Sequence, residues 1–184
     1  MAVRKIVRMG HPVLRQRARE LTAAEIGSDK IAALVDDMVE TLHDYGGIGL
    51  AAPQINEPVR LAIIDIPAGQ SRYGDLAELP LSVFINPRID VLDESRAGYW
   101  EGCLSVPGLR GFVTRPQHIR VTATDLSGEP VSLTLEGFNA TVFQYEFDHL
   151  DGLLFVDRID DSKYLLFEEE FVRYGEPRHN SQEP

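Results

Sequence analysis

The stretch QYEFDHLDG, residues Gln144–Gly152, decides the fold that we expect for this chain. It completes a helical pattern of apolar residues and ends in a glycine, which predicts a helix over 138–150. Residues four apart lie on one face of a helix, so Tyr145 and His149 converge on one point, with Glu146 on the adjacent edge. A helix that reads H-E-x-x-H holds a metal ion with two imidazoles, and here the first position is a tyrosine. Taken alone, the pattern is typical of a buried amphipathic helix.

Around this helix the chain reads as one further long helix and a series of short strands. A capping box followed by helical spacing predicts a helix over 22–45. Turn-forming residues predict loops over 69–80 and 93–98, and a last helix is expected over 162–174. Runs rich in branched residues predict strands that begin at Val59, Ser82, His118 and Pro130. This order predicts an α+β fold with an antiparallel or mixed sheet.

Length and composition limit the classes of protein that this chain can represent. It has 184 residues, 43% of them hydrophobic, so we expect a single catalytic domain over 1–175 and a polar, disordered tail over 176–184. A net charge of -11 argues against sequence-independent binding to nucleic acid or to an anionic membrane. No stretch approaches the roughly 20 apolar residues of a membrane helix, and no signal peptide is apparent, so we expect a cytoplasmic protein. The single cysteine excludes an intramolecular disulfide.

Two other stretches carry residues suited to chemistry. YWEGCLSVPG, residues Tyr99–Gly108, places Cys103 after Gly102, where the backbone can approach a bound molecule closely. A thiolate there could join the helix residues as a soft metal ligand, although a lone cysteine in a loop is otherwise a packing residue. GGIGLAAPQ, residues Gly46–Gln54, reads as a helix stop leading to a strand. A substrate chain could also approach this stretch, and Gln54 could donate an amide N–H to a developing oxyanion.

Together, these stretches resemble the peptide deformylase family in order and spacing. The family pattern G-x-G-L-A-A-P-Q, E-G-C-L-S and Q-H-E-x-D-H-L is matched here by GIGLAAPQ, EGCLS and QYEFDHL. The opening MGHPVLRQRA and the stretch SVPGLRG…TRP are also similar, so that the resemblance covers roughly Ile6 to Tyr164. It implies the peptide deformylase fold, an α+β fold with mixed or antiparallel sheets packed around a central HExxH-type helix. It also implies a metal-dependent hydrolase that removes the N-formyl group from the N-terminal formylmethionine of nascent polypeptides.

The resemblance implies a metal site on the central helix. Cys103 and His149 match two of the family's three ligands, and Tyr145 stands where the family has its other histidine. The implied cofactor is one divalent ion, Fe2+, with Ni2+, Co2+ or Zn2+ as substitutes. Arg115 resembles the family arginine that pairs with the aspartate of the motif, here Asp148, and would brace the ligands.

The resemblance also assigns catalytic and substrate-binding roles. Glu146 would take a proton from water and pass it to the departing amine. Gln54 and the backbone N–H of Leu104 would hold the tetrahedral oxyanion. The residues implied in substrate binding, as walls of the methionine pocket or partners of the peptide backbone, are Gly47, Ile48, Gly49 and Gly102.

The tyrosine leaves three hypotheses open. A phenol with a pKa near 10 must lose a proton before it binds metal, so we expect weakened metal binding. In the first hypothesis the chain is an active deformylase, with Tyr145 as an unusual ligand or with water, His43 or His118 completing the site. In the second it is a metal-poor homologue that binds formyl peptides without turnover. In the third it is a cysteine amidase with Cys103 as nucleophile and His149 as base.

The implied partners are N-formylmethionyl peptides. In bacterial deformylases the C-terminal helix resembles a ribosome-docking element and is commonly basic. The corresponding run here, FEEEFVRYGEP, is acidic, so the resemblance leaves ribosome contact open.

Overall fold

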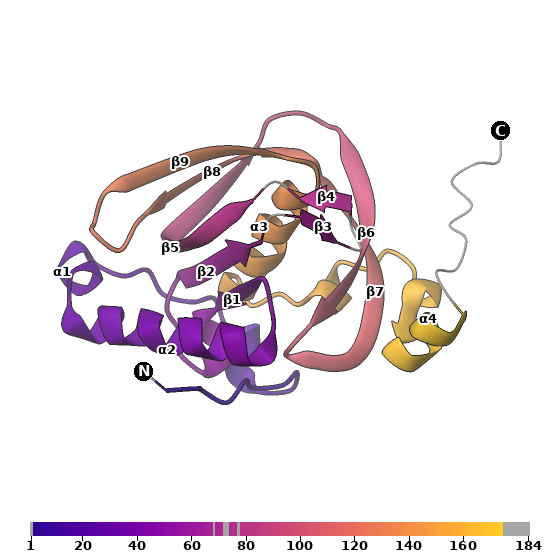
Figure 1. Cartoon of the computed structure of the whole chain (residues 1–184), viewed down its shortest axis with the longest axis horizontal. Coiled ribbons are helices and arrows are strands. Elements are labelled where there is room, and N and C mark those ends of the chain that lie inside the picture. Colours follow the sequence, from indigo (N-terminus) through magenta and orange to yellow (C-terminus); the bar gives the residue numbers. More distant parts are fainter. Residues whose placement is uncertain (1, 68, 72–73, 77, 175–184) are drawn as a thin grey trace.

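A computed structural model describes residues 2–67, 69–71, 74–76 and 78–174, and in it one helix lies between two sheets. This helix, α3 (Gly137–Leu150), is flanked by a five-stranded and a three-stranded sheet (Figure 1). All paired strands are antiparallel, so the expected α+β fold around a central helix is confirmed. The five-stranded sheet contains, in order, β1 (Gly49–Ala51), β2 (Leu61–Ile66), β5 (Leu79–Val91), β8 (His118–Thr124) and β9 (Pro130–Glu136). The other contains β10 (Leu165–Phe167), β7 (Val106–Pro116) and β6 (Arg96–Cys103).

The five-stranded sheet is covered on both faces. Along β2, Leu61 and Ile63 face the helix α2 (Asp29–Tyr45), whereas Ala62 and Ile64 face α3. Because strand side chains alternate between faces, a strand buried on both sides reads as the continuous apolar run LAIIDI. The core between sheet and α3 is aromatic, with the rings of Phe84 and Phe143 edge to face at 4.9 Å. This packing fixes α3 against the sheet.

The hairpin β6–β7 corrects the prediction for this part of the chain. We expected a loop over 93–98 and a cysteine in a loop, but β6 begins at Arg96 and Cys103 is its last residue. A two-residue turn over 104–105 leads into β7. The glycines that suggested a loop have a packing role: a Cβ on Gly98 would lie 2.2 Å from the ring of Phe112 on the paired strand. The loop expected over 69–80 is also wrong, because β3 (Gly69–Ser71), β4 (Gly74–Leu76) and the start of β5 lie within it.

The helices differ from the predictions at their ends. The helix expected over 22–45 is divided into α1 (Ala23–Ile26) and α2, because Ser28 starts a second helix by accepting a hydrogen bond from the amide of Ile31. The helix expected over 162–174 is a 3-10 turn, then β10, then the short helix α4 (Glu168–Tyr174). Leu165–Phe167 pairs with the edge of β7 instead of continuing as a helix. The tail expected over 176–184 lies outside the described residues.

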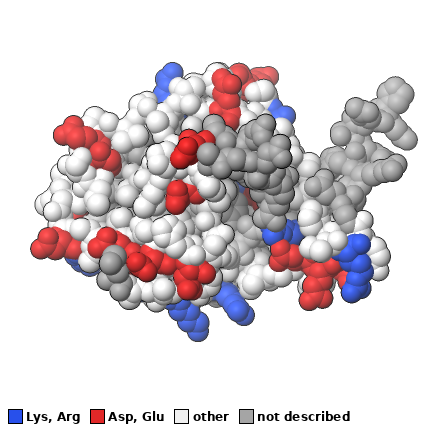
Figure 2. All heavy atoms as spheres, viewed as in Figure 1, with Lys and Arg blue, Asp and Glu red and all other residues white. Residues whose placement is uncertain are grey.

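The remaining features are short 3-10 turns and an acidic surface. Figure 2 shows Asp and Glu side chains spread over the face in view, in keeping with the net charge of -11. None of the helices in the described part of the chain combines the length and the apolar character needed to cross a bilayer. The 3-10 turns are η1 (Pro12–Arg15), η2 (Ala52–Ile55), η3 (Phe155–Asp157) and η4 (Ser162–Tyr164).

Candidate active site

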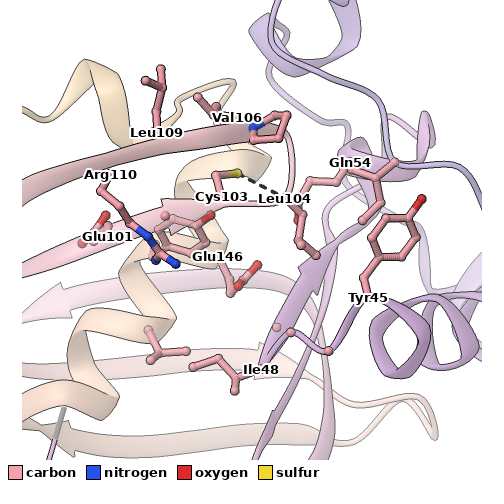
Figure 3. A pocket seen from close by; sticks show the side chains of 18 of the residues that line it. Tyr45, Ile48, Gln54, Glu101, Cys103, Leu104, Val106, Leu109, Arg110 and Glu146 are labelled. Atoms are coloured by element: carbon pink, nitrogen blue, oxygen red, sulfur yellow. Dashed lines mark hydrogen bonds between the residues drawn. The ribbon is translucent and has the colours of Figure 1, made fainter. Parts of the chain in front are cut away.

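A pocket of about 1540 Å³ opens between the hairpin β6–β7 and the segment that leads into β1. Tyr145 and Glu146 of α3 line it, and Cys103 lines it from the end of β6. Figure 3 shows Glu146 and Cys103 among the side chains around the pocket. The strand β1 is at the edge of its sheet, so one of its sides has no strand partner among the residues that the structure describes. The sequence stretches that resemble the deformylase motifs therefore meet around one cavity.

The thiol of Cys103 and the imidazole of His149 form the centre of the site. Sγ lies 3.6 Å from Nε2, and both side chains are buried. Burial raises the pKa of the Cys103 thiol to about 11, against a lowering by the Tyr145 side chain. Burial likewise lowers the pKa of His149 to about 4. At neutral pH the pair is a neutral thiol beside a neutral imidazole.

Tyr145 fills the space beside this pair. Its ring is nearly perpendicular to that of His149, with centroids 5.2 Å apart, as expected for residues one helical turn apart. It also packs against the apolar cluster that includes Cys103 and Val106. Burial raises the pKa of Tyr145 well above 10, and the nearby Cys103 and Glu146 add to the effect. The side chain is therefore a neutral phenol.

Glu146 faces the pocket with its carboxyl group. The residue is 3% exposed, and Oε2 has no hydrogen-bond partner among the described residues. Burial, and then the charge of Glu101, raise the pKa of Glu146 to about 8. The carboxyl lies over Gly49, where a Cβ would be 2.4 Å from Oε1. A glycine in β1 is thus needed for the carboxyl to reach the cavity.

Gln54 is held in one orientation next to the thiol. Its Oε1 accepts a hydrogen bond from the amide of Ala51 at 2.9 Å. This leaves Nε2 directed at Ser105 Oγ, 3.4 Å away, and at Cys103 Sγ, 3.8 Å away. The amide N–H is therefore presented to the centre of the site. The other residues predicted to bind substrate or oxyanion also line the pocket, namely Gly47, Ile48, Gly49, Gly102 and Leu104.

A buried ionic network braces α3 from behind. Arg115 donates to Asp148 at 2.8 Å, the predicted pairing, and also grips both oxygens of Glu101 at 2.7 and 3.0 Å. Arg158 makes two further hydrogen bonds to Asp148, at 2.6 and 3.2 Å. The sequence analysis missed Glu101 and Arg158. Glu101 belongs to the EGCLS motif. Its position two residues before the candidate ligand Cys103 was the signal that could have identified it.

The histidines considered as replacement ligands lie elsewhere. His43 is exposed on α2, with Nε2 3.5 Å from Asp65. His118 is on β8, where Nδ1 lies 2.7 Å from Asp93. Neither lines the pocket, and the structure does not bring either of them next to Cys103 and His149. Their positions in the sequence could not show whether the fold brings them close to Cys103.

Comparison with known proteins agrees with this architecture. A family pattern described as Polypeptide deformylase matches residues 3–164. A peptide deformylase from Leptospira biflexa serovar Patoc is 41% identical over 175 residues, covering 95% of this chain and 98% of the relative. One from Cellvibrio japonicus is 47% identical over 163 residues, or 89% of this chain and 90% of the relative. The Met-Ala-Ser-bound class I type b peptide deformylase from Acinetobacter baumannii superposes with a TM-score of 0.80 at 36% identity, covering 85% and 98% of the two chains.

The fold, the pocket and these relatives define an amide hydrolase. The chain belongs to the polypeptide deformylase family. Its activity is that of a deformylase, which removes the formyl group from N-formylmethionyl peptides, as the sequence analysis predicted.

Deformylases as a family require a divalent metal ion, and the donors of this site meet that requirement only in part. Two ligands of a tetrahedral Zn2+ ion lie about 3.5 Å apart at usual bond lengths. The separation of 3.6 Å between Cys103 Sγ and His149 Nε2 fits this value. Tyr145 is a protonated phenol in the metal-free protein and would have to lose its proton to become a ligand. No group of three or more His, Cys, Asp or Glu side chains that could hold a metal occurs in the part of the chain that the structure describes. Cys103 and His149 are the residues that would hold the ion, with Tyr145 beside them.

Proposed function

We propose that the pocket between β1 and the β6–β7 hairpin is where this chain hydrolyses N-formylmethionyl peptides, in the cytoplasm where such peptides are made. One observation carries the proposal. Glu146, Gln54 and Cys103 all line this cavity beside an edge strand, and His149 lies directly behind the thiol, with Nε2 3.6 Å from Sγ. A hydrolase acting on a formyl amide needs such a proton carrier and such an N–H donor around one carbon atom.

Glu146 is the group that moves protons in this proposal. It is close to the cavity, is without a competing hydrogen bond at Oε2, and has a pKa of about 8. A carboxyl whose pKa lies near the working pH can both accept a proton from water and return it to the departing amine. Gln54 Nε2 and the backbone N–H of Leu104 then stabilise the oxyanion of the tetrahedral intermediate.

The peptide itself would lie along β1. Gly49 begins the edge strand β1, Gly47 and Ile48 lead into it, and all three line the pocket. Extended peptides bind such edges through main-chain hydrogen bonds. Gly102 borders the opposite side of the same cavity. The Acinetobacter baumannii relative, which shares this fold, has been solved with Met-Ala-Ser bound. A peptide that begins with methionine is therefore a suitable probe for this chain.

The metal bound by this chain is proposed to be Fe2+, with Ni2+, Co2+ or Zn2+ as substitutes, held by Cys103 and His149. Tyr145 makes that binding weaker than in a site with a third imidazole. A metal-poor protein that binds formyl peptides without turnover is the second candidate, and Tyr145 is the observation that favours it. A cysteine amidase is disfavoured, because a thiol pKa of about 11 and an imidazole pKa of about 4 leave no thiolate–imidazolium pair at neutral pH.

The test is hydrolysis of a formyl-Met peptide by protein purified without oxygen, with bound iron, nickel and zinc counted per chain. We expect turnover by the wild type and a loss of at least about 100-fold in Glu146→Gln. An equally active Glu146→Gln variant would contradict the assigned role. Peptide binding without turnover would favour the second candidate. Turnover that survives chelation and disappears in Cys103→Ala would instead indicate the cysteine amidase.

A further inference from the structure

The C-terminal segment Leu165–Tyr174 lies beyond the region that matches the family pattern, yet it reaches the pocket. The family pattern ends at residue 164, and β10 and α4 follow directly. β10 adds to the edge of β7, with Leu166 opposite Arg110. This pairing brings Glu168, the first residue of α4, to the rim of the pocket. A segment beyond the match to the family pattern therefore contributes to the wall of the site.

Glu168 holds the guanidinium of Arg110. Both Nε, at 3.0 Å, and Nη2 donate to the same carboxylate oxygen. The third nitrogen, Nη1, has no partner among the described residues. It lies over Gly102, where a Cβ would be only 2.4 Å away. Figure 3 shows Arg110 reaching from its strand into the pocket on the side of Glu146 that is opposite Tyr45.

Apolar contacts anchor the same segment to the hairpin. The ring of Phe171 on α4 packs on Trp100 of β6 at a centroid distance of 5.0 Å. Trp100 also contacts Phe112 and Tyr164 and lines the pocket. The position of Glu168 is therefore fixed by strand pairing on one side and by aromatic packing on the other.

We propose that Arg110 donates a hydrogen bond through Nη1 to a main-chain carbonyl of the bound peptide, and that Glu168 is the residue that positions it. This inference rests on the proposed function of the pocket. Glu168 neutralises the guanidinium, so the free N–H suits a neutral carbonyl acceptor better than a carboxylate. The pair leaves Nη1 as the one guanidinium nitrogen without a carboxylate partner, and Gly102 leaves room for it next to Cys103. The segment Leu165–Tyr174 is then part of the substrate site.

The test compares Glu168→Gln with the matched control Glu169→Gln, which changes the exposed neighbouring residue on the same helix. For formyl-Met-Ala-Ser we expect Glu168→Gln to raise KM about 10-fold, the usual effect of losing a hydrogen bond to a charged group, with kcat within about twofold of the wild type. The control should leave both constants unchanged. In an Arg110→Ala background, Glu168→Gln should have no further effect, because its only role is to hold the missing side chain.

A charge signature separates positioning from a general structural role. Glu168→Gln leaves Arg110 with an uncompensated positive charge, so formyl-Met-Asp-Ser should lose less affinity than formyl-Met-Ala-Ser. Equal losses for the two peptides, an unchanged KM, or an effect that persists without Arg110 would each overturn the proposal.

Binding can be measured independently of turnover. Trp100 is the only tryptophan of the chain and lines the pocket, so its fluorescence should report titration with the product peptides Met-Ala-Ser and Met-Asp-Ser. If the wild type hydrolyses no formyl peptide, the proposed function fails, and the same variant series in this titration still decides the role of Glu168. If the wild type binds neither product peptide, the inference fails as well.

Discussion

Replacing Tyr145 with histidine should convert this site into a strong metal site. Cys103 Sγ and His149 Nε2 are already 3.6 Å apart, so an ion between them needs no rearrangement of either residue. An imidazole at 145 would sit one helical turn from His149 on the same face of α3. Loss of a group that only supports a ligand typically lowers metal affinity by about 10- to 100-fold. We therefore expect Tyr145→His to raise Zn2+ affinity by at least about 100-fold, or ~2.7 kcal/mol.

The assay is competition for Zn2+ against a chromophoric chelator, with Co2+ absorption as a second measurement. A tetrahedral Co2+ site with a thiolate ligand should appear in Tyr145→His at metal concentrations that leave the wild type unchanged. The control is Tyr145→Phe, which removes the hydroxyl and supplies no donor, and should bind no more tightly than the wild type. The reasoning is refuted if the wild type already binds Zn2+ as tightly as Tyr145→His, since the phenol would then be an adequate ligand.

Three further predictions concern the site and its support. Gly49→Ala should lower kcat/KM by at least about 10-fold while the protein stays folded, because the new methyl group displaces the carboxyl of Glu146; unchanged kinetics would show that the carboxyl is not needed there. Arg115→Met should lower the unfolding free energy by about 3–5 kcal/mol in urea, because two buried carboxylates lose their common partner; a loss under about 1 kcal/mol would contradict this. The pKa of Glu25 is lowered to about 2, first by Arg19, so its contribution is present above pH 4.5 and is lost as pH falls toward 2. In Glu25→Gln the thermal unfolding midpoint should accordingly fall less steeply between pH 4.5 and 2 than in the wild type. An unaltered dependence of the midpoint on pH would exclude this role.

The sequence was sufficient for the fold class and for the face of α3 that carries the chemistry. Helical spacing alone brings Tyr145, Glu146 and His149 together, because the three residues lie within one turn. The β6–β7 hairpin was not predictable in the same way, since its glycines are also typical of loops. Gly98 is a glycine because a ring on the partner strand crosses it, and this depends on strand register, which local sequence does not contain.

The candidate site was predictable where its residues lie in motifs and not where they meet through tertiary contacts. Cys103 and Gln54 were placed by resemblance, and the structure brings both to the pocket. Glu101 and Glu168 were missed, because the role of each depends on an ion pair with an arginine of β7. Strand pairing of β6 and β10 with β7 forms these ion pairs, and local sequence does not reveal that pairing. The break between α1 and α2 was missed for a simpler reason: Ser28 caps a new helix inside a pattern whose apolar period continues across it.

The hairpin β6–β7 carries the thiol, the arginine at the pocket rim and the arginine behind α3 on just two strands. Cys103 is opposite Val106 across a turn of two residues, 104–105. Strand side chains alternate with a period of two, so one residue inserted at this turn would rotate the thiol to the outer face while leaving the core residues of the other sheet untouched. Length changes at this turn should therefore abolish catalysis in proteins that still fold, whereas the β8–β9 connection, 125–129, does not line the pocket.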